Sequence, residues 1–179
     1  MAEAPDPQPP PPATNPAEPS DDAFIEVLNG EDDLGVVVRA HIHVEAKLLE
    51  LLELLVVDTK YLERMRLSFG HRVNMAVALG LNPEYAPPLS ALGTLRNAFA
   101  HSLDTQLSDE RVNKLHAALS GPVKDTVLLA YERTKTQLSM ADATPFKGLS
   151  PKFRFVLISV ALRGMLVASI REVRAREEG

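Results

Sequence analysis

The chain of 179 residues contains no cysteine and no tryptophan, and only 5% of its residues are aromatic. Without cysteine there can be no disulfide, no thiolate metal site and no cysteine nucleophile. The scarcity of aromatic rings argues against an extended surface that stacks nucleic-acid bases. Any chemistry must therefore come from carboxylate, imidazole, hydroxyl, amide and guanidinium groups.

The sequence also lacks an obvious targeting signal or membrane-spanning segment. The acidic, proline-rich residues 1–20 have neither the basic start nor the apolar core of a secretory signal. The apolar segment 48-LLELLELLVV-57 is interrupted by Glu50 and Glu53 and is too short to cross a bilayer. We therefore expect a cytoplasmic protein without membrane contact.

The net charge of -5 weighs against a dedicated nucleic-acid binder. The charges are unevenly distributed, however, because acidic side chains dominate residues 1–60 and basic side chains are in excess over residues 61–179. Two interpretations therefore remain: the folded domain has a basic face that could bind a polyanion, or its surface is merely solvated.

Proline divides the chain into two parts. Eight of the 14 prolines lie in residues 1–20, which predicts a disordered or polyproline-like tail. The remaining segment, 21–179, has the length of one domain, and a hydrophobic content of 45% is enough for a core. We therefore predict one folded domain that follows a tail.

Caps, stops and apolar spacing predict helices throughout the folded segment. Ser108 and the Ser150–Pro151 pair are typical helix starts, and Gly30 and Gly80 are typical helix ends. The predicted helices cover about residues 20–30, 33–57, 67–81, 88–102, 108–119, 122–137 and 151–179. No strand alternation is convincing. The sequence predicts an all-α fold, a single bundle of six or seven helices.

The predicted helix 33–57 is apolar around much of its circumference. Such a helix lies either at the centre of a bundle or in an interface between two chains. We therefore expect a homodimer.

The segment 96-RNAFAH-101 places three polar side chains in an otherwise apolar helix. Asn97 and His101 are four residues apart and share a face, whereas Arg96 lies about 140° from His101 but has a long side chain. A guanidinium that holds phosphate and an imidazole that moves a proton would suit a metal-independent ribonuclease. Alternatively, Arg96 pairs with a carboxylate and His101 bonds a backbone carbonyl, in a purely structural network.

A second cluster, 39-RAHIHVEAK-47, contains His41 and Glu45 at a spacing that could bind a divalent metal. No partner helix offers the further ligands, so we predict an ordinary pair on the helix surface and no metal. The predicted last helix carries Lys152, Arg154 and Arg163. Their participation in nucleic-acid binding would require them to join the pocket around Arg96.

Three blocks of the sequence resemble a known family. The Arg-x4-His string 96-RNAFAH-101 resembles the signature of the HEPN superfamily. The blocks 24-FIEVLNGEDDLGVVVRAHIHVEAKLLELLE-53, 67-LSFGHRVNMAVALGL-81 and 95-LRNAFAHS-102, taken in this order, resemble the mannitol operon repressor-like family. This resemblance covers roughly residues 22–120.

The resemblance implies an all-helical, commonly dimeric, HEPN-like fold and two competing functions. Repressor-like members are non-catalytic regulators that lack a recognised DNA-reading motif and act through protein contacts. Catalytic HEPN members are metal-independent endoribonucleases, and their catalytic roles would fall on Arg96 and His101, with Asn97 beside them. We expect a regulator with a protein partner and no cofactor; the alternative is a toxin or defence ribonuclease that binds RNA.

Overall fold

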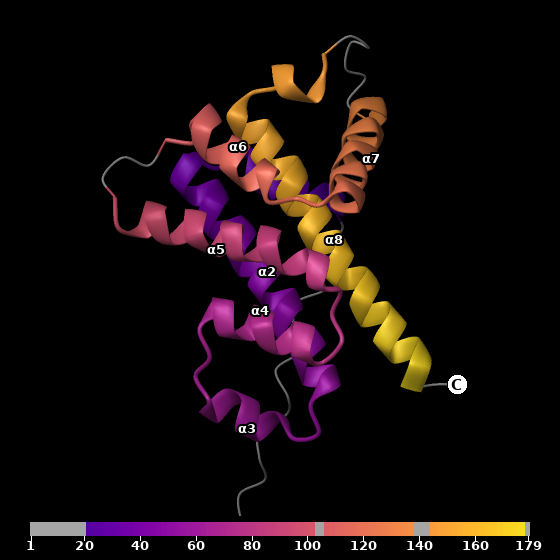
Figure 1. Cartoon of the computed structure of the whole chain (residues 1–179). Coiled ribbons are helices and arrows are strands. Elements are labelled where there is room, and N and C mark those ends of the chain that lie inside the picture. The colour runs from indigo at the N-terminus through magenta and orange to yellow at the C-terminus, as the bar shows by residue number, and fades with distance from the viewer. Residues whose placement is uncertain (1–20, 103–105, 138–143, 178–179) are drawn as a thin grey trace, which may run out of the picture.

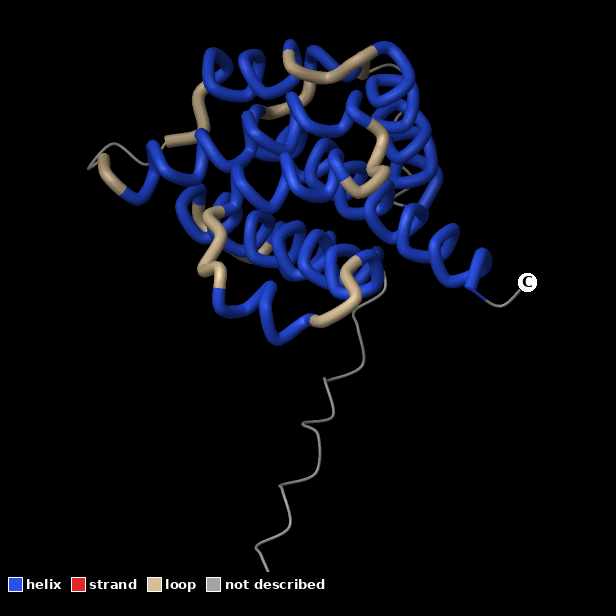
Figure 2. The backbone as a smooth tube through the Cα atoms, turned by 60° about the horizontal axis from the view of Figure 1, so that its bottom comes forward, coloured by secondary structure: helices blue, strands red, loops and turns tan. Residues whose placement is uncertain are grey.

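The computed structural model describes residues 21–102, 106–137 and 144–177, and in these residues the fold is all-α, without strands (Figures 1 and 2). The prediction for the tail at residues 1–20 lies outside the described part. The helices in chain order are α1 Asp21–Asn29, α2 Asp33–Leu55, α3 Thr59–Arg64, α4 Phe69–Ala78, α5 Ala86–Ala100, α6 Asp109–Ala117, α7 Gly121–Gln137 and α8 Pro151–Glu177, with the 3₁₀ turns η1 Pro83–Tyr85 and η2 Phe146–Gly148.

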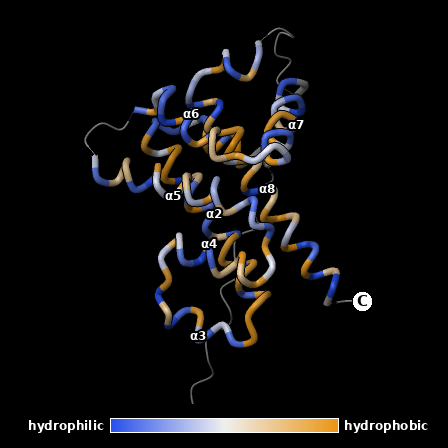
Figure 3. Tube along the Cα trace, viewed as in Figure 1, coloured by the Kyte–Doolittle hydropathy of each residue, from blue (hydrophilic) through white to orange (hydrophobic). Residues whose placement is uncertain are grey.

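The two longest helices, α2 and α8, pack along each other and form the centre of the bundle. Every residue from 155 to 162 is buried, so this part of α8 is enclosed on all sides. Figure 3 shows hydrophobic residues along the part of α8 that crosses the body and more hydrophilic residues toward its C-terminal end. The core lies where α1, α6 and α7 pack on α8 while α4 and α5 pack on α2.

One described helix has the length and composition of a membrane span. It covers Pro151–Arg176 in α8; its most apolar 18-residue window has a mean hydropathy of 1.8, and 72% of that window is buried inside the protein. The longest apolar run is therefore in α8 and not in the segment 48–57. A core helix of a bundle has the same composition, so this property does not indicate a membrane.

Side-chain caps explain where several helices start. Asp32 accepts a hydrogen bond from the Gly35 amide at 2.6 Å, which starts α2. Ser108 accepts one from the Arg111 amide at 3.4 Å and starts α6 at the predicted place. Each cap satisfies an amide that has no partner inside its helix.

The short helix α3 was not predicted from the sequence. It has six residues, begins after Asp58, which caps the Lys60 amide, and buries only Leu62. A segment of fewer than two turns cannot show the apolar period on which helix prediction depends. α3 lies at the end of the bundle beyond α4 (Figure 1).

Gly93 sets the distance between α4 and α5. An added Cβ at this position would lie 2.7 Å from Cδ1 of Phe69. Only glycine therefore allows the Phe69 ring, at the start of α4, to press against the α5 backbone. This close approach shapes the site described next.

Candidate functional site

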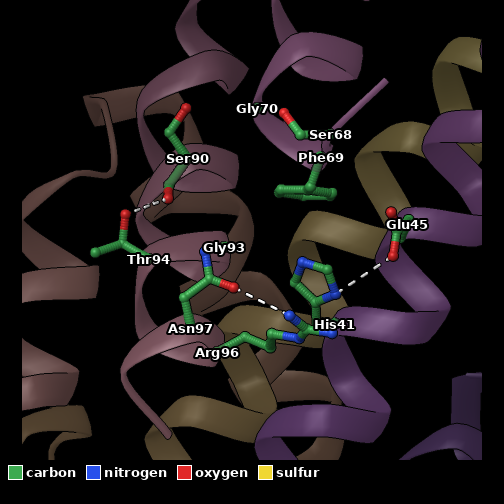
Figure 4. Close-up of a pocket in the computed structure, with 10 residues that line it drawn as sticks. All are labelled: His41, Glu45, Ser68, Phe69, Gly70, Ser90, Gly93, Thr94, Arg96 and Asn97. Atoms are coloured by element: carbon green, nitrogen blue, oxygen red, sulfur yellow. Dashed lines mark hydrogen bonds and ion pairs between the residues drawn. The ribbon is translucent and has the colours of Figure 1, made fainter. Parts of the chain in front are cut away.

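A hollow of about 520 Å³ opens between α2, the start of α4, and α5. Figure 4 shows its ten lining residues, which come from three segments far apart in the sequence. Ser68, Ser90, Thr94, Arg96 and Asn97 are all exposed, so the hollow is open to water.

The α5 wall carries Arg96 and Asn97. Arg96 Nη1 donates a hydrogen bond to Oδ1 of Asn97 at 3.0 Å, and within the described residues its guanidinium makes no ion pair with a carboxylate. Farther up the same wall, the Thr94 hydroxyl donates to the backbone carbonyl of Ser90 at 3.0 Å. The side of α5 that faces the hollow therefore presents a guanidinium whose charge only a neutral amide contacts.

The α2 wall carries a buried imidazole that contacts Phe69 and Glu45. His41 is 4% exposed, and its ring centroid lies 4.4 Å from that of Phe69. Its Nδ1 lies 3.6 Å from Oε2 of Glu45, and Oε1 of Glu45 accepts a hydrogen bond from Arg72 Nη1 at 2.7 Å. In Figure 4 the other ring nitrogen lies on the side away from Glu45. The ring is thus fixed by packing and by a carboxylate that Arg72 anchors.

Burial lowers the pKa of His41, because the charged imidazolium loses hydration in this position. The nearby Glu45 carboxylate opposes this shift, and the positive charge of Arg96 adds to it. The imidazole is therefore neutral at pH 7. A neutral, oriented imidazole beside a guanidinium can accept a proton, and its protonated form can assist in holding an anion.

The structure separates His101 from this hollow. His101 is the exposed C-cap residue of α5, its amide bonds to the Asn97 carbonyl at 3.2 Å, and its side chain does not line the hollow. Of the three residues predicted from the sequence, the structure brings Arg96 and Asn97 together and places His101 beyond the last turn of the helix. The imidazole that does share a hollow with Arg96 is His41.

The prediction that His41 and Glu45 form a pair on the helix surface was wrong for His41. The ring is buried because this side of α2 lies against α4 and α5 rather than in water. Within the part of the chain that the structure describes, no group of three or more acidic or imidazole side chains could hold a metal ion.

Three basic residues of α8, Lys152, Arg154 and Arg163, make contacts away from the hollow. Lys152 donates to the backbone carbonyls of Asn29 and Glu31. Arg154 is 3% exposed and pairs with the carboxylate of Asp109 on α6.

Arg163, which is 4% exposed, lies over the ring of Phe24 at 5.4 Å. None of the three α8 residues lines the hollow. The structure therefore assigns them to helix packing, and the hollow has no ring of basic side chains of the kind that a polyanion requires.

The sequence reasoning missed the α4 contribution and the role of His41. The only signal for His41 was its spacing from Glu45, which fits many helix surfaces. Ser68, Ser90 and Thr94 gave no signal, because isolated hydroxyls are common at caps and on exposed faces.

Comparison with known proteins found no match to a protein family, a curated protein or a solved structure.

Proposed function

We propose that the chain is a non-catalytic regulatory protein, similar to the mannitol operon repressors, that acts through dimerisation and protein contacts in transcriptional or RNA-level control. The observation that supports this proposal is a stripe of uncovered apolar side chains on α2. A regulator without a DNA-reading motif must work through such surfaces.

The α2 stripe consists of Leu34, Val38 and Ile42, spaced by four residues on one face of the helix. Leu34 is 38% exposed, Ile42 is 57% exposed, and Val38 between them is half-buried. The opposite faces of α2 are already covered by α8, α4 and α5. A second copy of the chain fits this stripe, because a two-fold contact places the same apolar patch of both chains face to face.

A second uncovered surface lies at the other end of α2. Val57, Tyr61 and Met65 follow each other at intervals of four residues around α3, and all three are exposed. We assign this surface to the protein partner, since aromatic and methionine side chains are enriched at the centres of protein interfaces.

Sedimentation of two matched variants tests the dimer. Ile42 and Met65 have the same exposed fraction, 57%, and neither side chain contributes to the buried core. In the proposed dimer, Ile42→Glu places two carboxylates in a desolvated interface and yields monomers, whereas Met65→Glu leaves the dimer intact. A wild-type protein that sediments as a monomer at micromolar concentration would contradict the proposal.

The second candidate function is a metal-independent endoribonuclease. It is favoured by one observation, namely that Arg96 and Asn97 line a solvent-open hollow that His41 also lines. In such a reaction the imidazole would take the proton of the ribose 2′-hydroxyl, whose oxygen would bond to the phosphorus of the phosphate that Arg96 holds. The bond from phosphorus to the 5′-oxygen would break, and water would protonate the leaving oxygen.

Cleavage of single-stranded RNA in EDTA tests the ribonuclease. Activity that disappears in Arg96→Ala and in His41→Ala, but persists in His101→Ala, would assign the proton transfer to His41. Activity that is lost in His101→Ala would instead assign the proton transfer to His101. Both conclusions require that circular dichroism shows the variants to be folded. Absence of cleavage by the wild-type protein removes this candidate and leaves the regulator.

A further inference from the structure

We infer that the hollow between α2, α4 and α5 binds the phosphate group of a small molecule, with Arg96 and Asn97 as the phosphate-holding residues. This inference goes beyond the proposed regulatory function and does not depend on dimerisation.

The first argument is the local charge. The side chains with permanent charge at the hollow are Arg96 from α5 and Glu45 from α2, and Glu45 is already neutralised by Arg72 of α4 at 2.7 Å. The guanidinium of Arg96 therefore has an uncompensated charge inside a concave site. Its planar fork matches two oxygens of a phosphate, and its present contact is only an amide oxygen at 3.0 Å.

The second argument is the set of polar groups that line the hollow together with that fork. Asn97 has an amide nitrogen that can donate to the same oxyanion once its oxygen is held by Arg96. Ser90 also lines the hollow and lies more than one helical turn before Arg96 on α5. Its hydroxyl makes no side-chain hydrogen bond to another described residue. The hollow thus offers neutral donors beside one cation.

The size and depth of the site favour a small molecule over a nucleic acid. A volume of about 520 Å³ lies in the usual range of small-molecule pockets. The Phe69 ring, which packs on the buried His41 ring, gives the hollow an aromatic inner wall against which the organic part of a phosphate ester can pack. A nucleic acid would need further cations along its backbone, and the buried α8 arginines, Arg154 and Arg163, are committed to the core.

The test is a titration of the full chain with inorganic phosphate, followed by amide chemical shifts in NMR. We expect saturable shifts confined to the residues of α2, α4 and α5 around the hollow. Arg96→Gln should weaken binding by about ten- to a hundredfold, as is usual when a charged hydrogen bond is lost.

The matched control is Arg133→Gln, which removes an exposed arginine of α7 far along the chain from the hollow. It should bind phosphate like the wild type. Three results would overturn the inference: no saturable shift at about 10 mM phosphate, an unchanged affinity in Arg96→Gln, or an equal loss in both variants.

A parallel titration with a short single-stranded RNA distinguishes the phosphate of a small molecule from the phosphates of an RNA backbone. RNA that binds tightly at the hollow while inorganic phosphate does not would overturn the small-molecule inference and favour the ribonuclease. Phosphate binding with no added affinity for RNA supports the inference. Neither result depends on whether Ile42→Glu gives monomers, so the regulatory proposal stands or fails separately.

Discussion

At the scale of single residues, the hollow combines an unpaired positive charge with an imidazole kept neutral by its surroundings. Arg96 contacts only the amide of Asn97, and His41 is buried between Phe69 and Glu45. A bound phosphate would add a negative charge near both groups. It would offset the positive charge of Arg96, which lowers the pKa of His41, and so favour protonation of the ring. The two groups are therefore expected to act together on an anion.

The histidines also predict how stability depends on pH. Burial lowers the pKa values of His41, His43 and His116, so the folded chain holds these rings neutral where the unfolded chain would protonate them. The unfolded state therefore binds more protons than the folded state at acid pH. The stability that the neutral rings contribute to the fold is complete above about pH 6.5 and is lost as the pH falls below that value.

Urea unfolding measured from about pH 8 to pH 5 checks this expectation. The midpoint should fall on acidification, and His41→Gln should reduce the dependence, because it removes one of the three rings. His101→Gln is the control, since this exposed side chain takes no part in the packing. A midpoint that rises on acidification would contradict the burial of these rings.

At the scale of helices, the contact between α4 and α5 shapes the site. Gly93 allows Phe69 to lie against the α5 backbone, and Phe69 in turn packs on His41. Gly164 in α8 differs from Gly93, because a Cβ added there meets no atom within 4 Å.

The two glycines make a matched pair for mutation. Gly93→Ala should destabilise the fold by roughly 1–2 kcal/mol, because overpacking costs more than alanine gains in helix propensity. Gly164→Ala should stabilise it by about 0.5–1 kcal/mol. Chemical denaturation measures both, and equal effects of the two substitutions would contradict the close contact at Gly93. Gly93→Ala should also weaken phosphate binding, since Phe69 must move.

The helices were largely predictable because their ends carry local signals. Asp32, Ser108 and Gly80 mark boundaries by capping or by a positive φ, and each signal lies within a few residues of the helix end that it marks. α3 was not predictable, since its six residues have one buried side chain.

The site was predictable only in part. Arg96 and Asn97 stood out as polar groups in an apolar helix, and they do line the hollow. The role of His41 depends on which face of α2 meets α4 and α5, and an apolar helix carries no local signal for that choice. His101 was grouped with Arg96 because both are close in sequence, but α5 ends at Ala100 and the hollow opens a turn earlier.

At the scale of the whole molecule, the bundle leaves apolar surface uncovered, while Lys152, Arg154 and Arg163 in the first half of α8 make contacts inside the fold. Arg154 bonds Asn113 at 2.9 Å and pairs with Asp109, so its charge ties α8 to α6 instead of facing a partner. The exposed large apolar side chains include those of the α2 stripe and the α3 surface, and also Leu128 and Leu129 of α7, which are 46% and 62% exposed. The uncovered apolar surface agrees with the proposed action through protein contacts.

The absence of cysteine allows a direct test of the α2 contact. A single cysteine introduced by Ile42→Cys is the only thiol in the chain and can be joined to its copy by a short bismaleimide. The dimer through α2 predicts a covalent dimer with Ile42→Cys and a monomer with Met65→Cys. Monomers with both variants, or equal linkage at both positions, would contradict the proposal that α2 joins two copies of this regulator.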